Sequence, residues 1–130
     1  MIVNEKEITT NDEINHPFHY TFSNIEVIDV IEDWNLNYHI GNVIKYIARA
    51  GKKGSFDIDI KKAIWYIDRF MKLKGREKFD SIDEKVVKYK LDVVVKEWNL
   101  DNRLASIVRN IFEGDYKNAQ RGMINLFDSS

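Results

Sequence analysis

The chain has 130 residues and a mass of 15.4 kDa, with 44% hydrophobic and 32% charged residues. This composition fits one compact soluble domain, because no apolar run approaches the roughly 18–20 residues that a membrane-spanning helix needs. The absence of cysteine excludes a disulfide framework, a thiolate zinc site, an iron–sulfur cluster and a cysteine nucleophile.

The formal net charge of −1 conceals a strong asymmetry along the chain. Residues 1–33 carry eight acidic side chains and one basic side chain, a net charge of −7. Residues 43–78 carry eleven basic and four acidic side chains, a net charge of +7. The middle of the chain is therefore where we expect an anionic partner to bind. The alternative is a solvated basic face that pairs with the acidic N-terminal segment.

The N-terminal segment, residues 1–15, is polar and aperiodic, and we expect it to form a flexible acidic arm. Residues 23–26 (Ser-Asn-Ile-Glu) have the pattern of a capping box and predict the start of a helix that ends near Trp34. Apolar side chains at helical spacing predict its buried side. They are Ile25, Ile28 and Ile31.

Two further helices are predicted in the first half of the chain. Asn37 is a suitable N-cap for a helix over residues 38–50, and Gly51 supplies its C-terminal stop. After a short loop, apolar residues at helical spacing predict a third helix over residues 57–74, which Gly75 ends. These elements place the basic middle of the chain on two helices and the loop between them.

The second half of the chain also predicts helices. Residues 81–84 (Ser-Ile-Asp-Glu) form a second capping box, and apolar residues from Val86 onward predict a helix that continues to Trp98. Two shorter helices should follow, over residues 101–113 and 115–127, on either side of Gly114. No strand–turn–strand pattern occurs, so the predicted fold class is all-α.

The chain also resembles itself at an offset of 64 residues, where residues 29–47 align with residues 93–111. The identical pairs are Val30/Val94, Trp34/Trp98, Asn35/Asn99, Leu36/Leu100 and Ile47/Ile111. We therefore predict a six-helix bundle in one compact domain, built from two three-helix pseudo-repeats over residues 16–75 and 76–130. Basic residues and glycines cluster only in the loop of the first repeat, which makes that repeat the better candidate for function.

On a helical wheel, one face of the second helix combines an aromatic ring, an amide and two cations within about 60°. These residues are Tyr38, Asn42, Lys45 and Arg49. Such a face can stack a base and hold a phosphate, and the following sequence Gly51-Lys52-Lys53-Gly54-Ser55 lets backbone N–H groups approach an anion. The alternative is a solvated face whose cations complement the C-terminus of the helix.

Other kinds of site are less well supported by the sequence. No Walker A motif occurs, which excludes a conventional P-loop kinase or ATPase. His16 and His19 have metal-ligand spacing, but Pro17 lies between them, so no metal site is assigned. We favour the interpretation that the two histidines belong to a structural turn or donate hydrogen bonds to a ligand phosphate. Glu26 and Asp29 have the spacing for magnesium, although a solvated acidic face is favoured. Duplex nucleic acid is not an expected partner, because the net charge is slightly negative.

An ordered series of motifs resembles a small bacteriophage family of unknown function that is similar to the phage nucleotide-kinase family lacking a P-loop. The resemblance covers about residues 15–71 and lies in four motifs: His16-Pro17-x-His19-Tyr20, Ile25-Glu26-x-Ile28-Asp29, Gly41-Asn42-x-Ile44-Lys45-Tyr46-x-x-Arg49-x-Gly51-x-Lys53, and Lys61-Lys62-Ala63-Ile64-Trp65-Tyr66. It implies nucleotide handling and, for its characterised branch, phosphorylation of deoxynucleoside monophosphates. The C-terminal half matches no motif of that family.

The leading hypothesis is a phage-encoded protein that binds nucleotide phosphates, with nucleotide kinase as the candidate activity and Mg²⁺ as a companion of the nucleotide only. The candidate catalytic residues are His16, His19, Glu26 and Asp29. The candidate ligand-binding residues are Tyr20, Tyr38, Asn42, Lys45, Tyr46, Arg49, Lys52 and Lys53. The lysines and Arg49 would hold phosphates, and Tyr38 or Tyr46 would stack the base. Either histidine would donate or transfer protons, and Glu26 or Asp29 would orient a ribose hydroxyl or a metal.

Two alternatives have the same sequence features. In one, the chain is a non-catalytic binder that sequesters a host nucleotide signal or inhibits a host protein as a counter-defence. In the other, it is an interaction module whose basic face meets an acidic protein surface. In each case we expect a location in the host cytoplasm, no membrane association and a homo-oligomer.

Overall fold

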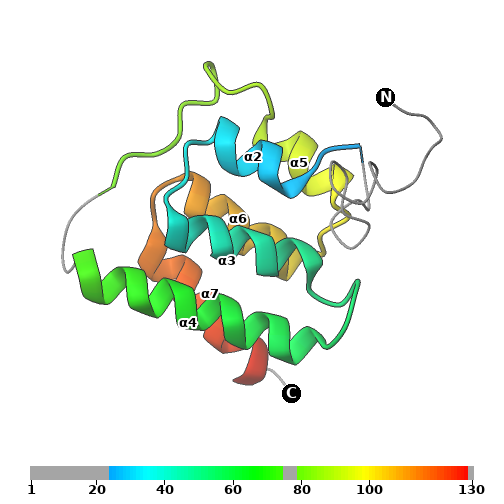
Figure 1. The fold of residues 1–130 in the computed structure, drawn as a ribbon, viewed down its shortest axis with the longest axis vertical. Helices are drawn as coiled ribbons and strands as arrows, with labels where there is room; N and C mark the ends of the chain where they lie inside the picture. Colours follow the sequence, from blue (N-terminus) through cyan, green and yellow to red (C-terminus); the bar gives the residue numbers. More distant parts are fainter. Residues whose placement is uncertain (1–23, 75–78, 129–130) are drawn as a thin grey trace, which may run out of the picture.

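The computed structural model describes residues 24–74 and 79–128, and these two ranges contain six α-helices and no strand. The helices are α2 (Val27–Asp33), α3 (Tyr38–Arg49), α4 (Phe56–Lys74), α5 (Leu91–Glu97), α6 (Asn102–Phe112) and α7 (Tyr116–Asp128). For the described residues the predicted all-α class is confirmed. Helices α3 and α6 lie between α2 and α5 on one side and α4 and α7 on the other (Figure 1).

The core forms where the apolar stripes of α3 and α6 face α4 and α7. The apolar stripe of α3 is completely buried, and it is matched by fully buried side chains on the other three helices. These residues are Ile40, Val43, Ile44 and Ile47 on α3, Ile60, Ala63 and Ile67 on α4, Val108 and Ile111 on α6, and Ala119 and Met123 on α7. Each large aliphatic side chain contributes about 1.5–3 kcal/mol by leaving water. The polar residues on the opposite side of α3, Asn42, Lys45 and Arg49, are partly exposed.

Asparagine residues form the sharp turns that precede α3 and α6. Asn35 and Asn99 have φ values of +54° and +53°, in the left-handed region that asparagine tolerates better than most residues. The next helix then begins at a capped position in both places. The side chain of Asn37 accepts a hydrogen bond from the backbone N–H of Ile40 at 2.9 Å. In the same way, the side chain of Asp101 accepts a hydrogen bond from the backbone N–H of Leu104 at 3.0 Å. The predicted N-cap at Asn37 is confirmed.

Two buried tryptophans connect the halves of the chain through backbone carbonyls. Trp34, at the end of α2, donates its indole N–H to the carbonyl of Tyr89 at 2.8 Å. Trp98, at the end of α5, donates to the carbonyl of Ile25 at 2.8 Å. The segment before each of these helices is therefore held by a side chain of the opposite half.

The start predicted for the first helix is wrong. Helix α2 begins at Val27, and Glu26 before it has an extended backbone and makes no side-chain cap; Ser23, the expected cap, lies outside the described residues. The carbonyl of Ile25 is used by Trp98, which favours an extended conformation there. The buried residues of α2 are consequently Val27 and Val30, whereas Ile28 is half exposed.

The helix predicted from Val86 to Trp98 is also wrong in its first part, because only residues 91–97 are helical. The carboxylate of Asp33 accepts hydrogen bonds from the backbone N–H groups of Lys88 and Tyr89, at 3.0 and 2.8 Å. The N–H of Ile82 donates to the carbonyl of Phe112 at 2.7 Å. These distant partners replace the helical hydrogen bonds that the local pattern predicted.

Candidate functional site

The polar face of α3 borders a small open pocket of about 160 Å³. Three of the predicted ligand-binding residues, Tyr38, Asn42 and Lys45, line it together with apolar residues of α2 and the turn that follows. The close packing of α2 on α3 needs Gly41, since a Cβ at this position would lie 3.2 Å from the side chain of Ile31. The amide nitrogen of Asn42 donates to the carbonyl of Tyr38 at 2.8 Å, which fixes this side chain at the pocket.

Beside the pocket, five rings of α3 and α4 form a continuous group that we call the aromatic cluster. Its members are Tyr38, His39, Tyr46, Trp65 and Tyr66. Tyr46 and Tyr66 are stacked, with centroids 6.0 Å apart and planes 16° from parallel. Tyr66 also meets Tyr38 and Trp65 edge to face, with centroid distances of 6.0 and 5.1 Å. These offset and edge contacts are the arrangements that aromatic rings prefer.

Two lysines place positive charge on the aromatic cluster. The ammonium groups of Lys45 and Lys62 lie 5.1 and 5.4 Å from the centroid of the Tyr46 ring. Both distances are within the range of cation–π attraction. The face formed by α3 and α4 therefore combines exposed ring surface with cations, the chemistry that suits a base and a phosphate.

A hydrogen bond favours the protonated form of Tyr66, the central ring of the aromatic cluster. The pKa of Tyr66 is raised above its ordinary value, first by a hydrogen bond with Tyr38 and then by partial burial and the neighbouring Tyr38 and Tyr46. Its hydroxyl group is thus neutral near pH 7 and available as a donor or acceptor.

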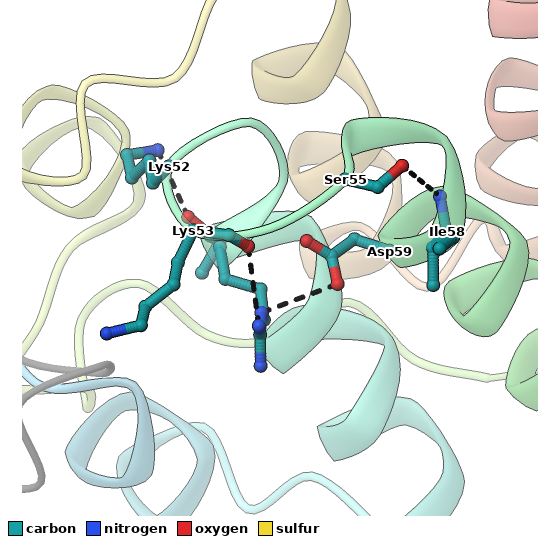
Figure 2. Close-up of polar contacts among 7 residues, drawn as sticks. Lys52, Lys53, Ser55, Ile58 and Asp59 are labelled. Atoms are coloured by element: carbon teal, nitrogen blue, oxygen red, sulfur yellow. Dashed lines mark hydrogen bonds and ion pairs between the residues drawn. The ribbon is translucent and has the colours of Figure 1, made fainter.

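Arg49, a candidate phosphate ligand, contacts the loop between α3 and α4 and the start of α4. Its guanidinium donates to the carbonyl of Lys53 at 3.3 Å, and its Nε lies 3.4 Å from Oδ1 of Asp59 (Figure 2). Asp59 is buried, with 4% of its surface exposed. Burial raises the pKa of Asp59, and the charges of Arg49 and Lys62 oppose that rise. Arg49 therefore stabilises the loop, and the helical wheel alone did not indicate this contact.

The two loop lysines differ in their surroundings. Lys52 donates to the carbonyl of Ala48 at 3.0 Å, at the C-terminus of α3, where a cation is favourable (Figure 2). Burial lowers the pKa of Lys52, and the charge of Asp101 raises it in part. The side chain of Lys53 is exposed and points away from Asp59 (Figure 2). Both residues are exposed, and the contact of the Lys52 ammonium with the end of α3 is a difference between them.

The other candidate residues do not line the described pocket. Glu26 precedes α2 and Asp29 lies in its first turn, both partly exposed. His16, His19 and Tyr20 lie outside the described residues. Within residues 24–74 and 79–128, no group of three or more histidine or acidic side chains has an arrangement that could hold a metal ion.

Sequence reasoning did not assign site roles to Asp59, Lys62, Trp65 and Tyr66. The spacing of 62, 65 and 66 places these three residues on one side of α4, a pattern visible in the sequence. Their proximity to Tyr38 and Lys45, however, depends on how α4 packs against α3.

Comparison with known proteins relates the region that contains this face to phage proteins. Residues 14–68 match the model of a protein family of unknown function (DUF3310). The Gene 1.7 protein of Enterobacteria phage T3 is 40% identical over 72 residues, which cover 48% of this chain and 44% of that protein. The chain thus spans less than half of that relative's length, and no solved structure matches it. These matches support the resemblance to phage proteins of unknown function and do not extend to a kinase.

None of the helices in the described part of the chain is both long enough and apolar enough to span a bilayer.

Proposed function

We propose that this chain is a phage-encoded protein that binds a nucleotide or another phosphorylated small molecule on the face formed by α3 and α4. The observation that carries the proposal is the combination of the aromatic cluster with Lys45 and Lys62 beside an open pocket. Aromatic rings bind the faces of bases, and lysines attract phosphate. The charge asymmetry of the sequence, which is positive over residues 43–78, supports an anionic ligand.

The size of the pocket indicates which part of the ligand it can hold. A pocket of about 160 Å³ is smaller than the roughly 300 Å³ or more of typical small-molecule sites, so it takes one ring system. In this proposal the base lies against Tyr38 with Asn42 as a polar partner, and the phosphate lies at Lys45 and Lys62. Lys53 remains a candidate phosphate ligand, whereas Arg49 and Lys52 position the loop.

The proposal includes a candidate reaction and an alternative to it. The reaction is phosphoryl transfer from a nucleoside triphosphate to a deoxynucleoside monophosphate, which yields two diphosphates. Mg²⁺ would come with the triphosphate, His16 or His19 would transfer the proton, and Glu26 or Asp29 would orient a hydroxyl or the metal. The alternative is a binder without turnover that sequesters a host nucleotide signal or inhibits a host protein. Product analysis of any nucleotide that binds distinguishes the two, because only the kinase makes a diphosphate.

The first test is a thermal-shift panel of mono-, di-, tri- and cyclic nucleotides, each with and without Mg²⁺. A ligand at about 100 times its Kd adds roughly 2.7 kcal/mol to the free energy of unfolding, which gives a clear rise in Tm. Lys45→Ala should lower the affinity about ten-fold and lower the Tm of the ligand-free protein only slightly, because it also removes the cation–π contact with Tyr46. Arg49→Ala should lower the Tm of the ligand-free protein, because this substitution removes the contacts to Asp59 and Lys53.

The matched control is Lys85→Ala, which removes an exposed lysine far along the chain from the proposed site and should change neither quantity. A panel without any shift would contradict the nucleotide proposal and favour the interaction module, whose assembly with an acidic partner would weaken with salt. Light scattering of the purified chain would test the predicted homo-oligomer.

We also propose that the bundle consists of two related three-helix units, α2–α4 and α5–α7. Three observations support this arrangement. Helices α2 and α5 have bounds that differ by the same 64 residues as the sequence alignment. Asn35 and Asn99, which both have a left-handed backbone, are 64 positions apart in the sequence. The two carbonyl groups that accept the indole hydrogen bonds, those of Ile25 and Tyr89, are also 64 positions apart. A reciprocal pair of this kind is typical of a two-fold relation.

A further inference from the structure

The aromatic cluster has two strongly exposed rings, one at each end. Tyr38 is 70% exposed and Trp65 is 60% exposed, whereas Tyr66, which contacts both, is partly buried. Each outer ring contacts Tyr66, at centroid distances of 6.0 and 5.1 Å. The outer rings therefore lie within about 11 Å of each other, which is the sum of those two distances. Large rings left in water at this spacing are two separate stacking platforms.

The surroundings of Trp65 on α4 are cationic. Lys62 and Arg69 lie three and four residues away from it, hence on neighbouring turns of the same helix, and both are exposed. The ammonium of Lys61, also four residues away, lies 6.0 Å from the ring of Phe127 on α7. The acidic residue nearest in sequence, Asp68, accepts a hydrogen bond from Gln120 of α7 at 2.6 Å. Its charge is therefore directed toward α7, and the surface beside Trp65 suits a phosphate backbone.

A single nucleotide accounts for only one of these platforms. Its one base would lie at Tyr38 in the pocket, and nothing in that mode of binding uses Trp65 or Arg69. A duplex does not fit either, because its bases are stacked on each other and present edges and not faces. Single strands expose base faces, and proteins that bind them combine aromatic platforms with a positive track for the backbone.

We propose that this face binds single-stranded nucleic acid, with one unpaired base stacked on Tyr38 and a nearby base of the same strand stacked on Trp65. The inference rests on the proposed function for the Tyr38 end of the site and extends it to Trp65 and the cations of α4. The ammonium groups of Lys45 and Lys62 lie over the ring of Tyr46, which stacks on Tyr66, the ring that both platforms contact. In this proposal these two lysines hold the connecting phosphates, and Arg69 holds the backbone beyond Trp65. DNA and RNA share this chemistry.

The test compares a fluorescent oligothymidylate of about eight nucleotides, within the site sizes of known single-strand binding modules, with thymidine 5′-monophosphate on the full chain. Anisotropy should give an affinity for the oligonucleotide at least about five-fold above that of the mononucleotide, because each stacked base adds roughly 1–3 kcal/mol. An oligouridylate of the same length distinguishes DNA from RNA. In addition, the oligonucleotide should quench the fluorescence of Trp65, since Trp34 and Trp98 are buried.

Two variants separate the platforms. Trp65→Leu should weaken oligonucleotide binding about ten-fold and leave mononucleotide binding unchanged, whereas Tyr38→Leu should weaken both. Val86→Ala, at a side chain 77% exposed in a distant segment of the chain, is the control and should change neither. Both test positions are exposed, so an unchanged Tm verifies that each variant is folded.

Three results would overturn the inference: equal affinity for the two ligands, no effect of Trp65→Leu, or equal competition by polyglutamate, which would indicate an acidic protein partner. If the mononucleotide still binds in a Tyr38-dependent manner, the proposed function stands while the extension to a strand fails. If neither ligand binds, both fail.

Discussion

At the scale of single residues, the pair formed by Asp59 and Arg49 has an unusual environment. Asp59 is almost completely buried, while about a fifth of the Arg49 side chain remains exposed. Among the described residues, Oδ2 of Asp59 and Nε of Arg49 are buried atoms without a hydrogen-bond partner. The Coulomb attraction at 3.4 Å is thus accompanied by a substantial cost of removing the carboxylate from water.

This cost gives a pH dependence whose sign follows from the raised pKa of Asp59. The folded chain binds the proton of Asp59 more tightly than the unfolded chain, in which the pKa is about 3.9. The contribution of Asp59 to the free energy of unfolding should therefore increase as the pH falls from neutral through the folded-state pKa, and should level off below the unfolded value.

The measurement is urea unfolding of the wild-type chain and of Asp59→Asn over a pH series. The wild type should gain stability relative to the variant as the pH falls toward about 4. Asp57→Asn, at an exposed position in the same helical turn, is the control and should run parallel to the wild type. If the free energy of unfolding of Asp59→Asn had the same pH dependence as that of the wild type, the raised pKa of Asp59 would be contradicted.

At the scale of elements, the segment before α5 depends on a side chain from the end of α2. Asp33 accepts the backbone N–H groups of Lys88 and Tyr89, and the indole of the adjacent Trp34 binds the carbonyl of Tyr89. The carboxylate substitutes for the carbonyl groups that a helix or turn would supply. This segment therefore has its conformation only while it is packed on α2.

Replacing Asp33 with alanine should lower the free energy of unfolding by about 1–3 kcal/mol, since two backbone donors lose their partner. The amides of Lys88 and Tyr89 should also exchange with solvent faster than in the wild type. Hydrogen exchange followed by NMR checks the local effect, and urea unfolding checks the total. Asp92→Ala removes an exposed carboxylate on α5 and serves as the control. Unchanged exchange at both amides would show that Asp33 does not hold the segment.

At the scale of the whole molecule, the two halves are joined by their tryptophans as well as by the apolar core. Each indole donates to a carbonyl of the other half, and each ring is buried. In addition, Trp34 meets Phe112 of α6 edge to face, with centroids 4.9 Å apart. The bundle should therefore unfold as one cooperative unit and not as two independent halves.

Trp34→Phe and Trp98→Phe test this connection, because phenylalanine keeps an aromatic ring and removes the N–H donor. Each should lower the free energy of unfolding by about 1–3 kcal/mol, through the unpaired carbonyl and the reduced packing. Trp65→Phe, at an exposed position, should change it by less than about 0.5 kcal/mol. Two separate unfolding transitions in any of these variants, or no cost at Trp98, would contradict a jointly stabilised bundle.

The sequence by itself determined the all-α class, the N-cap at Asn37, the bounds of α3, α4, α6 and α7 to within about two residues, and the buried stripe of α3. These features depend on periodicity and on caps within a few residues, so local sequence contains the information that fixes them. The same holds for Tyr38, Asn42 and Lys45, which share one face of a single helix and line one pocket.

Only the tertiary structure decided the features whose partners are distant in sequence. Residues 86–90 are not helical, because Asp33 and Trp34, more than 50 residues away, take their hydrogen-bonding groups. Arg49 is turned to Asp59, and the aromatic cluster exists because α4 packs on α3 and brings Trp65 and Tyr66 to Tyr38. Periodicity specifies which face of a helix is apolar, but it does not specify which other helix covers that face or which polar group meets a buried charge.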